Sequence, residues 1–164
     1  MFRKRITPGP GQESVWDYPR PPKIEACDSK IRIVTNNIVI AETAESFRVL
    51  ETSHPPVFYL PPHSIRMDLL RESDHGSFCE WKGYANYHTL VLQDQIVADV
   101  AWSYRAPTNR FEALAGYLAF YPSKVDACFV NDEEVEAQPG DFYGGWITSR
   151  VVGPFKGSPG TMGW

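Results

Sequence analysis

Alternation of apolar and polar residues is the strongest structural signal in this chain. From Ile31 to Ile40, apolar residues at every second position flank residues 35–37, where two Asn tolerate the positive φ that a tight turn needs. The same arrangement recurs twice, with turns at residues 93–95 and 131–133. These segments predict three β-hairpins and not a repeat of fixed period.

Proline and glycine limit the remaining elements. Residues 57–60 are an apolar run with two prolines on either side, which predicts a short or edge strand. Residues 65–70 fit either a helical turn or a strand, and the one plausible helix covers about 109–115. Glycine and proline among the aromatics after residue 140 exclude a helical period there. We therefore expect a mainly β chain with one short helix, or at most two.

The composition changes near residue 30, which divides the chain into two parts. Residues 1–29 are rich in proline and predict an extended arm, and Trp16 and Tyr18 indicate that this arm packs on the core. Residues 30–164 predict a single β domain that includes the glycine- and aromatic-rich C-terminal segment.

Composition and charge exclude several classes of protein. With 43% hydrophobic and 13% aromatic residues in 164, the chain is too apolar to be disordered. A net charge of −4 argues against binding nucleic acid, and no apolar run is long enough for a membrane span. Three widely spaced cysteines predict neither a disulfide framework nor a structural zinc site. We expect a soluble, cytoplasmic protein that contacts no membrane, and a homodimer is compatible with the sequence.

Chemically active side chains are densest between Cys79 and His88. If this segment is one extended strand, alternation places Cys79, Trp81 and Tyr87 on one face and Lys82 and His88 on the other. Cys79 is then either a small buried side chain or a nucleophile. The nucleophile hypothesis rests on Lys82, a cation three residues from the thiol, and either side chain could be the nucleophile of an enzyme.

A second set of candidates could form a ligand pocket. Large aromatic residues with polar tips are typical of concave binding sites, although in a small β protein they also form the core. The candidates for ligand contacts are Trp81, Tyr87, Trp102, Tyr104, Tyr121 and, as a polar contact, Asp126.

Other motifs give no specific signal. His75 and Cys79 have a spacing that zinc sites use, but no second ligand pair lies near them, so we expect no metal and no cofactor. His54 and His63 lie beside prolines, which favours loop histidines that hydrogen-bond to the backbone. Residues 153–161 lack the order of a phosphate-binding loop, and no hydrolase, kinase or dinucleotide signature is present.

Four motifs in this order resemble the family called domain of unknown function 427. They are residues 51–56 (Glu-Thr-Ser-His-Pro-Pro), 79–83 (Cys-Glu-Trp-Lys-Gly), 101–104 (Ala-Trp-Ser-Tyr) and 116–121 (Gly-Tyr-Leu-Ala-Phe-Tyr). The similarity extends to residues 16–19, 125–128 and 142–146, and so covers nearly the whole chain.

The resemblance implies strongly twisted antiparallel sheets, similar to the β-tent proteins that include a Rab exchange factor and methionine sulfoxide reductase B. Some of those proteins bind zinc through two C-x-x-C pairs, which this chain lacks. Many family members have His before the motif cysteine, whereas this chain has Phe78. The nucleotidyltransferase label attached to the family is not supported here, because no Gly-Ser motif with paired aspartates is present.

Three functional hypotheses remain. The first is a module that binds a small molecule or a peptide in an aromatic-lined pocket. The second is an enzyme with a Cys79 or Lys82 nucleophile, and the third is a structural or protein-interaction domain. Convergence of these two residues with Trp102 and Tyr121 in a closed pocket would favour the first two hypotheses, whereas a solid core there would leave only the third.

Overall fold

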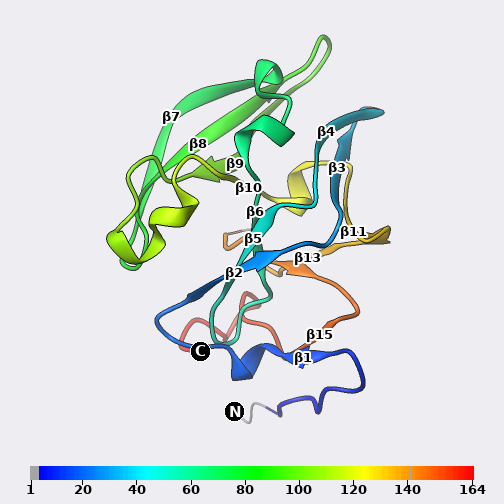
Figure 1. Ribbon diagram of the computed structural model, residues 1–164, viewed down its shortest axis with the longest axis vertical. Helices are drawn as coiled ribbons and strands as arrows, with labels where there is room; N and C mark the ends of the chain where they lie inside the picture. Colours follow the sequence, from blue (N-terminus) through cyan, green and yellow to red (C-terminus); the bar gives the residue numbers. More distant parts are fainter. Residues whose placement is uncertain (1–3, 141) are drawn as a thin grey trace.

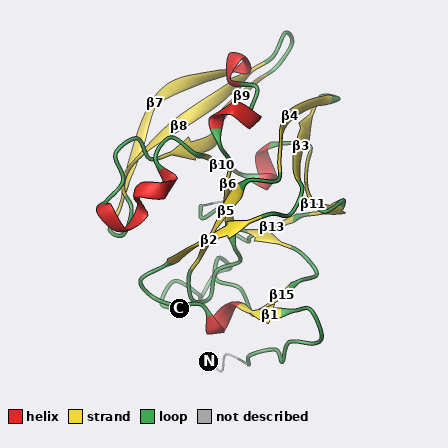
Figure 2. Ribbon diagram, viewed as in Figure 1, coloured by secondary structure: helices red, strands yellow, loops and turns green. Residues whose placement is uncertain are grey.

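The computed structural model describes residues 4–140 and 142–164, which form a mainly β fold with short helical turns (Figure 1, Figure 2). The sheet with the longest strands is antiparallel, with the order β10-β9-β8-β7. Its strands are β7 (Leu70–Cys79), β8 (Gly83–Val91), β9 (Ile96–Ser103) and β10 (Leu118–Phe120).

A second antiparallel sheet, β2-β5-β6, continues the first at its β10 edge. Leu60, directly after β6, exchanges two backbone hydrogen bonds of 2.8 and 2.9 Å with Leu118 of β10. The strands are β2 (Lys23–Cys27), β5 (Ser46–Leu50) and β6 (Val57–Tyr59). The short strand predicted between the proline pairs is therefore confirmed, and it joins the two sheets.

The third sheet contains two of the three predicted hairpins. Its order is β12-β11-β3-β4, formed by β3 (Ile31–Thr35), β4 (Ile38–Thr43), β11 (Ala127–Val130) and β12 (Glu133–Glu134). Asn36 and Asn37 have φ of 51° and 62°, as a two-residue hairpin turn requires. The third hairpin, β8–β9, turns at the predicted place, so all three hairpins are confirmed.

The two ends of the chain meet beneath these sheets (Figure 1). β1 (Glu13–Ser14) pairs in parallel with β15 (Val151–Val152), and β13 (Glu136–Ala137) pairs with β14 (Trp146–Ile147). Trp16 and Tyr18 are buried in a small cluster with Leu50. The segment expected as an arm thus packs on the core, and its last part is strand β2. The division of the chain at residue 29 stays a prediction.

The helical turns are all of the 3₁₀ type. The segment η4 (Asn109–Leu114), where the sequence predicts a helix, is two short turns that meet at a kink at Phe111. The others have three residues each: η1 (Val15–Asp17), η2 (Pro62–Ser64), η3 (Met67–Leu69) and η5 (Pro122–Lys124). Among the described residues, no helix has the length and apolar character of a membrane span.

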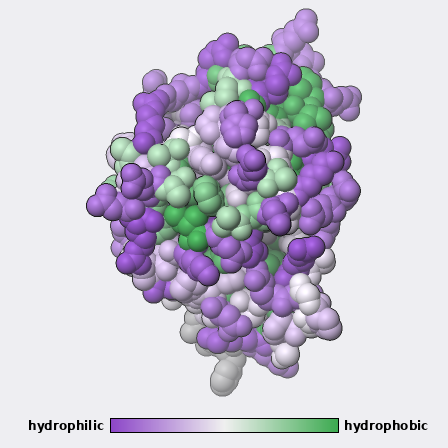
Figure 3. All heavy atoms as spheres, in the orientation of Figure 1, coloured by the Kyte–Doolittle hydropathy of each residue, from purple (hydrophilic) through white to green (hydrophobic). Residues whose placement is uncertain are grey.

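Strand β9 separates two buried clusters. Ala101 belongs to the larger cluster, which includes Ile33 of β3 and Phe120 of β10. Trp102, the next residue, points to the other side and packs with Tyr104 in a cluster of mainly aromatic residues. In the view of Figure 3, hydrophilic residues cover most of the surface and hydrophobic residues gather in small patches. The aromatic cluster encloses the cavity described next.

Candidate binding pocket

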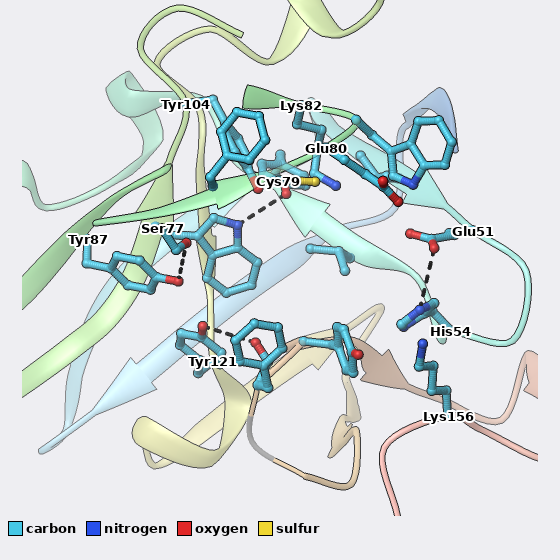
Figure 4. A pocket seen from close by; sticks show the side chains of 18 residues that line it. Glu51, His54, Ser77, Cys79, Glu80, Lys82, Tyr87, Tyr104, Tyr121 and Lys156 are labelled. Carbon is cyan, nitrogen blue, oxygen red and sulfur yellow. Dashed lines mark hydrogen bonds and ion pairs between the residues drawn. The ribbon is translucent and has the colours of Figure 1, made fainter. Parts of the chain in front are cut away.

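A cavity of about 300 Å³ lies on the aromatic side of β9 (Figure 4). Its walls come from β7, β8 and the turn between them, from β5 and β6 with the loop between them, and from β9. Tyr121, directly after β10, and residues 142–156 complete them. The aromatic residues that line it are Tyr59, Phe78, Trp81, Tyr87, Trp102, Tyr104, Tyr121, Phe142 and Tyr143.

Hydrogen bonds hold the aromatic wall in place. The indole Nε1 of Trp102 donates to the Tyr59 hydroxyl at 3.2 Å, and the Trp102 and Tyr121 rings pack with centroids 4.6 Å apart. Tyr121 donates its hydroxyl to the carbonyl oxygen of Phe142 at 3.2 Å. Burial raises the pKa of the Tyr59, Tyr104 and Tyr121 phenols, so all three are uncharged at neutral pH. The wall is therefore rigid and neutral.

The turn from Glu80 to Lys82 corrects one prediction from the sequence. We expected Lys82 on the face opposite Cys79, because the segment was treated as one unbroken strand. The strand ends at Cys79, and the chain reverses so that Cys79 pairs with Gly83. Gly83 has φ of 102°, which favours glycine at the end of this turn. Cys79 and Lys82 consequently line the same cavity.

The turn is fixed by Thr108, which follows β9. Its backbone N–H donates to the Lys82 carbonyl at 3.1 Å, and its hydroxyl donates to the Trp81 carbonyl at 2.6 Å. His88 lies further along β8 and hydrogen-bonds to Ser103, on the face away from the cavity. The expectation that His88 faces away from Cys79 is therefore confirmed.

Lys82 is buried although it is charged. Its side chain is 9% exposed, and no other described Lys, Arg, Asp or Glu is buried to this degree. Its Nζ lies 5.8 Å from the centroids of both the Tyr104 and the Phe111 rings, and the Cys79 sulfur is beside it (Figure 4). Burial alone would lower the pKa of Lys82, but interactions with Tyr59, Cys79 and Glu51 outweigh burial and raise it. Lys82 is therefore an ammonium ion at neutral pH.

His54 is a neutral imidazole at the other end of the cavity. The Gln138 Oε1 accepts the Gly145 N–H at 3.0 Å, so its Nε2 is the donor that faces His54 Nδ1 at 3.1 Å. The protonated His54 Nε2 then lies 3.7 Å from the carboxylate of Glu51. Burial, together with the positive charges of Lys156, Arg20 and Lys82, lowers the pKa of His54 to about 3. His54 is therefore neutral although Glu51 is close, mainly because it is buried.

The structure brings seven of the eight predicted site residues to one cavity. Those that line it are Cys79, Trp81, Lys82, Tyr87, Trp102, Tyr104 and Tyr121. Asp126 lies elsewhere, where its carboxylate accepts the Asn36 N–H at 2.7 Å and supports the β3–β4 turn. Cys79, Lys82, Trp102 and Tyr121 thus converge on one cavity, which is partly open to solvent and not closed, and the roles of these residues stay predictions.

Sequence reasoning missed the polar end of the cavity. Glu51, His54 and Lys156 line it, and none of them was singled out as a site residue. His54 was expected to hydrogen-bond to the backbone, but its partner is the side chain of Gln138, 84 positions away in the chain. The only signal in the sequence was the motif at residues 51–56, which contains two of these residues.

His75 and Cys79, whose spacing in the sequence occurs in zinc sites, have separate surroundings in the structure. His75 hydrogen-bonds to Asp99 at 2.9 Å and stacks on the Tyr87 ring, whereas Cys79 lies at the Lys82 turn. In the described part of the chain, no three His, Cys, Asp or Glu side chains are grouped as metal ligands.

A family model matches most of the residues that line the cavity. The model is described as a domain of unknown function, DUF427, and it matches residues 23–131, which is more than half of the chain. The chain belongs to the DUF427 family. No curated protein matches it.

The DUF427 match divides the cavity into two parts. Cys79, Lys82, Trp102 and Tyr121 lie within the matched residues, as does the polar motif at 51–56. Phe142, Tyr143 and Lys156 follow the matched region and close the cavity from the other side. The DUF427 part thus supplies the strand-borne wall, and the C-terminal segment supplies the rest.

Proposed function

We propose that this DUF427 protein binds a small molecule in the cavity between the β7–β8 turn and residues 142–156. The observation that carries the proposal is a cavity of about 300 Å³ with aromatic walls and a buried ammonium group. Ligand pockets typically have volumes of roughly 300–1,000 Å³, apolar walls and a few polar groups that orient the ligand. A peptide could use the same site by inserting one side chain.

The rigidity of the wall supports this proposal. Trp102 is held by Tyr59 and Tyr121, so a ligand would meet a surface that is already ordered. Two exposed aromatic residues, Phe78 and Phe142, stand at the cavity and are 74% and 67% exposed. Exposed rings beside a cavity are typical of an entrance through which an apolar ligand passes.

A thermal-shift screen against a metabolite library tests the proposal. A compound at 100 times its dissociation constant adds about 2.7 kcal/mol to the free energy of unfolding, which raises the melting temperature measurably. The shift is expected to disappear in Trp102→Leu and to persist in Phe129→Leu, which removes an aromatic ring from β11, away from the cavity. A library without any stabilising compound, or hits unaffected by Trp102→Leu, would contradict the proposal.

One observation favours a second candidate, an enzyme with Cys79 as nucleophile. The Cys79 thiol is half-buried at the cavity, and the Lys82 ammonium beside it would stabilise a thiolate. The raised pKa of Lys82 supports a role as this activating cation over a role as a nucleophilic amine. Covalent trapping of Cys79 by a substrate-like electrophile, detected by mass spectrometry, would distinguish this candidate from simple binding.

A further inference from the structure

The Lys82 ammonium lines the cavity without forming an ion pair with any described carboxylate. Among the described residues, no carboxylate lies within the 4.0 Å of an ion pair with its Nζ. Of the groups that interact with it electrostatically, Tyr59 is an uncharged phenol, Cys79 is the thiol beside it, and Glu51 is the one carboxylate. A buried charge is costly unless a charge of opposite sign is close. An anionic group of a ligand beside Lys82 would therefore reduce the cost of burying this ammonium group.

Glu51 is already engaged elsewhere. Its Oε2 accepts a hydrogen bond from Arg20 Nε at 3.2 Å and lies 3.7 Å from His54 Nε2. The contact with His54 lies on the side of Glu51 that faces away from Lys82 (Figure 4). Glu51 is therefore paired with Arg20 and His54, and it forms no ion pair with Lys82.

A second ammonium group adds to the positive potential. Lys156 enters the cavity from the C-terminal segment, where its Nζ lies 5.4 Å from the centroid of the Tyr143 ring and 3.4 Å from the carbonyl oxygen of Trp164. Lys82 and Lys156 thus belong to separate elements that meet only around this cavity. Burial is the main reason why the pKa of His54 is lowered, and the charges of these two lysines and of Arg20 lower it further.

The balance of charges and donors indicates which anion fits. The charged residues that line the cavity are Lys82, Lys156, Glu51 and Glu80, and Glu80 is exposed to solvent. No arginine is among the described lining residues. Phosphate sites usually supply Arg forks or several backbone N–H groups, so a single negative charge fits better than a phosphate dianion.

We propose that the cavity selects a small aromatic monocarboxylate, whose carboxylate pairs with Lys82 and whose ring packs on Trp102 and Tyr121. This inference rests on the proposed function, because it requires that a ligand occupies the cavity. The ligand carboxylate supplies the negative charge beside Lys82, and the ligand ring packs against the neutral aromatic wall. Neutral analogues of the same shape keep the ring contacts but lose the pairing with Lys82.

Matched acid and amide pairs test the inference. The probes are benzoate and benzamide, 2-naphthoate and 2-naphthamide, and indole-3-acetate and indole-3-acetamide, with dissociation constants measured by calorimetry or NMR titration. In the wild-type protein, at least one acid is expected to bind about tenfold or more tightly than its amide, the strength of a hydrogen-bonded charge pair in a desolvated site.

Substitutions of Lys82 assign the preference to one residue. Lys82→Met keeps most of the side-chain volume and should reduce the affinity for the acid to that for the amide, with the amide unchanged. Lys82→Gln serves the same purpose if the Met variant does not fold, and Lys82→Arg should retain the preference for the acid. Lys30→Met, which removes an exposed lysine, is the matched control and should behave like wild type.

The outcomes separate this inference from the proposed function. Amides that bind as tightly as acids, or a preference that survives in Lys82→Met and Lys82→Gln, would overturn the inference and leave the proposed function in place. The inference also fails if no acid binds while neutral compounds of the metabolite library do. If neither the paired probes nor the library contains a binder, both proposals fail.

Discussion

Cys79 and Lys82 lie at the two sides of the turn between β7 and β8, and both side chains line the same cavity. A thiol and an ammonium are thereby placed together in a largely aromatic environment. The relationship exists because the chain reverses at residues 80–82, and an unbroken strand would have separated the two groups. The first prediction follows from this arrangement.

Iodoacetamide is expected to alkylate Cys79 at least about tenfold faster than Cys128, because thiolate availability and access control the reaction. Cys128 is 1% exposed, and burial raises the pKa of its thiol. Peptide mass spectrometry at successive times measures both rates in one sample. Lys82→Met should slow the reaction at Cys79, whereas Lys30→Met should not. A rate at Cys79 no faster than that of free cysteine would count against the nucleophile candidate.

The neutral state of His54 makes stability depend on pH. Its pKa is about 3 in the folded protein, against about 6.5 in an unfolded chain. Between these values only the unfolded chain binds the proton, so the free energy of unfolding falls as the pH drops below about 6.5, by roughly 1.4 kcal/mol per pH unit. Denaturant titrations at pH 7 and pH 5 should therefore show a loss of about 2 kcal/mol from this group.

His54→Asn isolates this contribution, because its amide oxygen can still accept the hydrogen bond from Gln138. The variant should lose less stability than wild type between pH 7 and pH 5. His63→Asn, at a largely exposed histidine, should lose as much as wild type. Equal losses in wild type and His54→Asn would show that His54 is not held neutral.

Gln138 connects three otherwise separate segments. Its side chain accepts the Gly145 N–H and donates to the Lys156 carbonyl at 2.8 Å and to His54. Gln138→Leu would leave several buried polar groups without partners, so we expect a loss of about 2–4 kcal/mol in the free energy of unfolding. Denaturant unfolding measures this loss. Gln93→Leu, at an exposed position in the β8–β9 turn, should change stability by less than about 0.5 kcal/mol, and a similar loss in both variants would contradict the assigned role.

Gly144 sets how closely the C-terminal segment approaches the aromatic wall. It has φ of 73°, and a Cβ there would lie 2.5 Å from Cη2 of Trp102. Gly144→Ala must therefore strain the backbone and also displace the Trp102 ring. Gly116 has φ of 77° with open space around it, so Gly116→Ala carries the backbone strain alone, about 1–2 kcal/mol.

The two glycine variants are compared by denaturant unfolding and by ligand affinity. Gly144→Ala is expected to lose more stability than Gly116→Ala and, in addition, to weaken ligand binding at the cavity. Gly116→Ala should leave binding unchanged. If both variants bind a ligand of the cavity as wild type does, the contact between Gly144 and Trp102 does not shape the site.

Local patterns were sufficient to predict the elements of the fold. The Asn-rich turn at residues 36–37 and the turns at 93–95 and 131–133 are encoded by neighbouring residues, and hairpins formed at all three. The failure at Lys82 is also local in origin. Glu-Trp-Lys contains neither Gly nor Pro, so nothing within the turn distinguishes it from a strand, and only Gly83 marks its end.

The candidate site was predictable only in part, because its halves are far apart in sequence. Trp102 and Tyr121 are large aromatic residues within motifs, which is a signal that a single sequence contains. The pairing of His54 with Gln138, and the entry of Lys156, depend on how the C-terminal segment crosses the sheets. The spacing of apolar residues along a sequence reports local structure only, so it cannot reveal contacts between residues this far apart. Asp126 is the opposite case. It was predicted as a polar ligand contact, but its carboxylate supports the β3–β4 turn.

The position of residues 142–156 outside the matched region has a consequence for how ligand preference can diverge. These residues add Phe142, Tyr143 and Lys156 to the cavity, but they belong to neither of the sheets β10-β9-β8-β7 and β2-β5-β6 that form its other walls. Exchanging this segment would alter the shape and charge of one wall and leave the strand framework intact. If the cavity binds a ligand as proposed, the strands would supply Lys82 and Trp102 as constant contacts. Differences in residues 142–156 alone would then be enough to change which molecule fits.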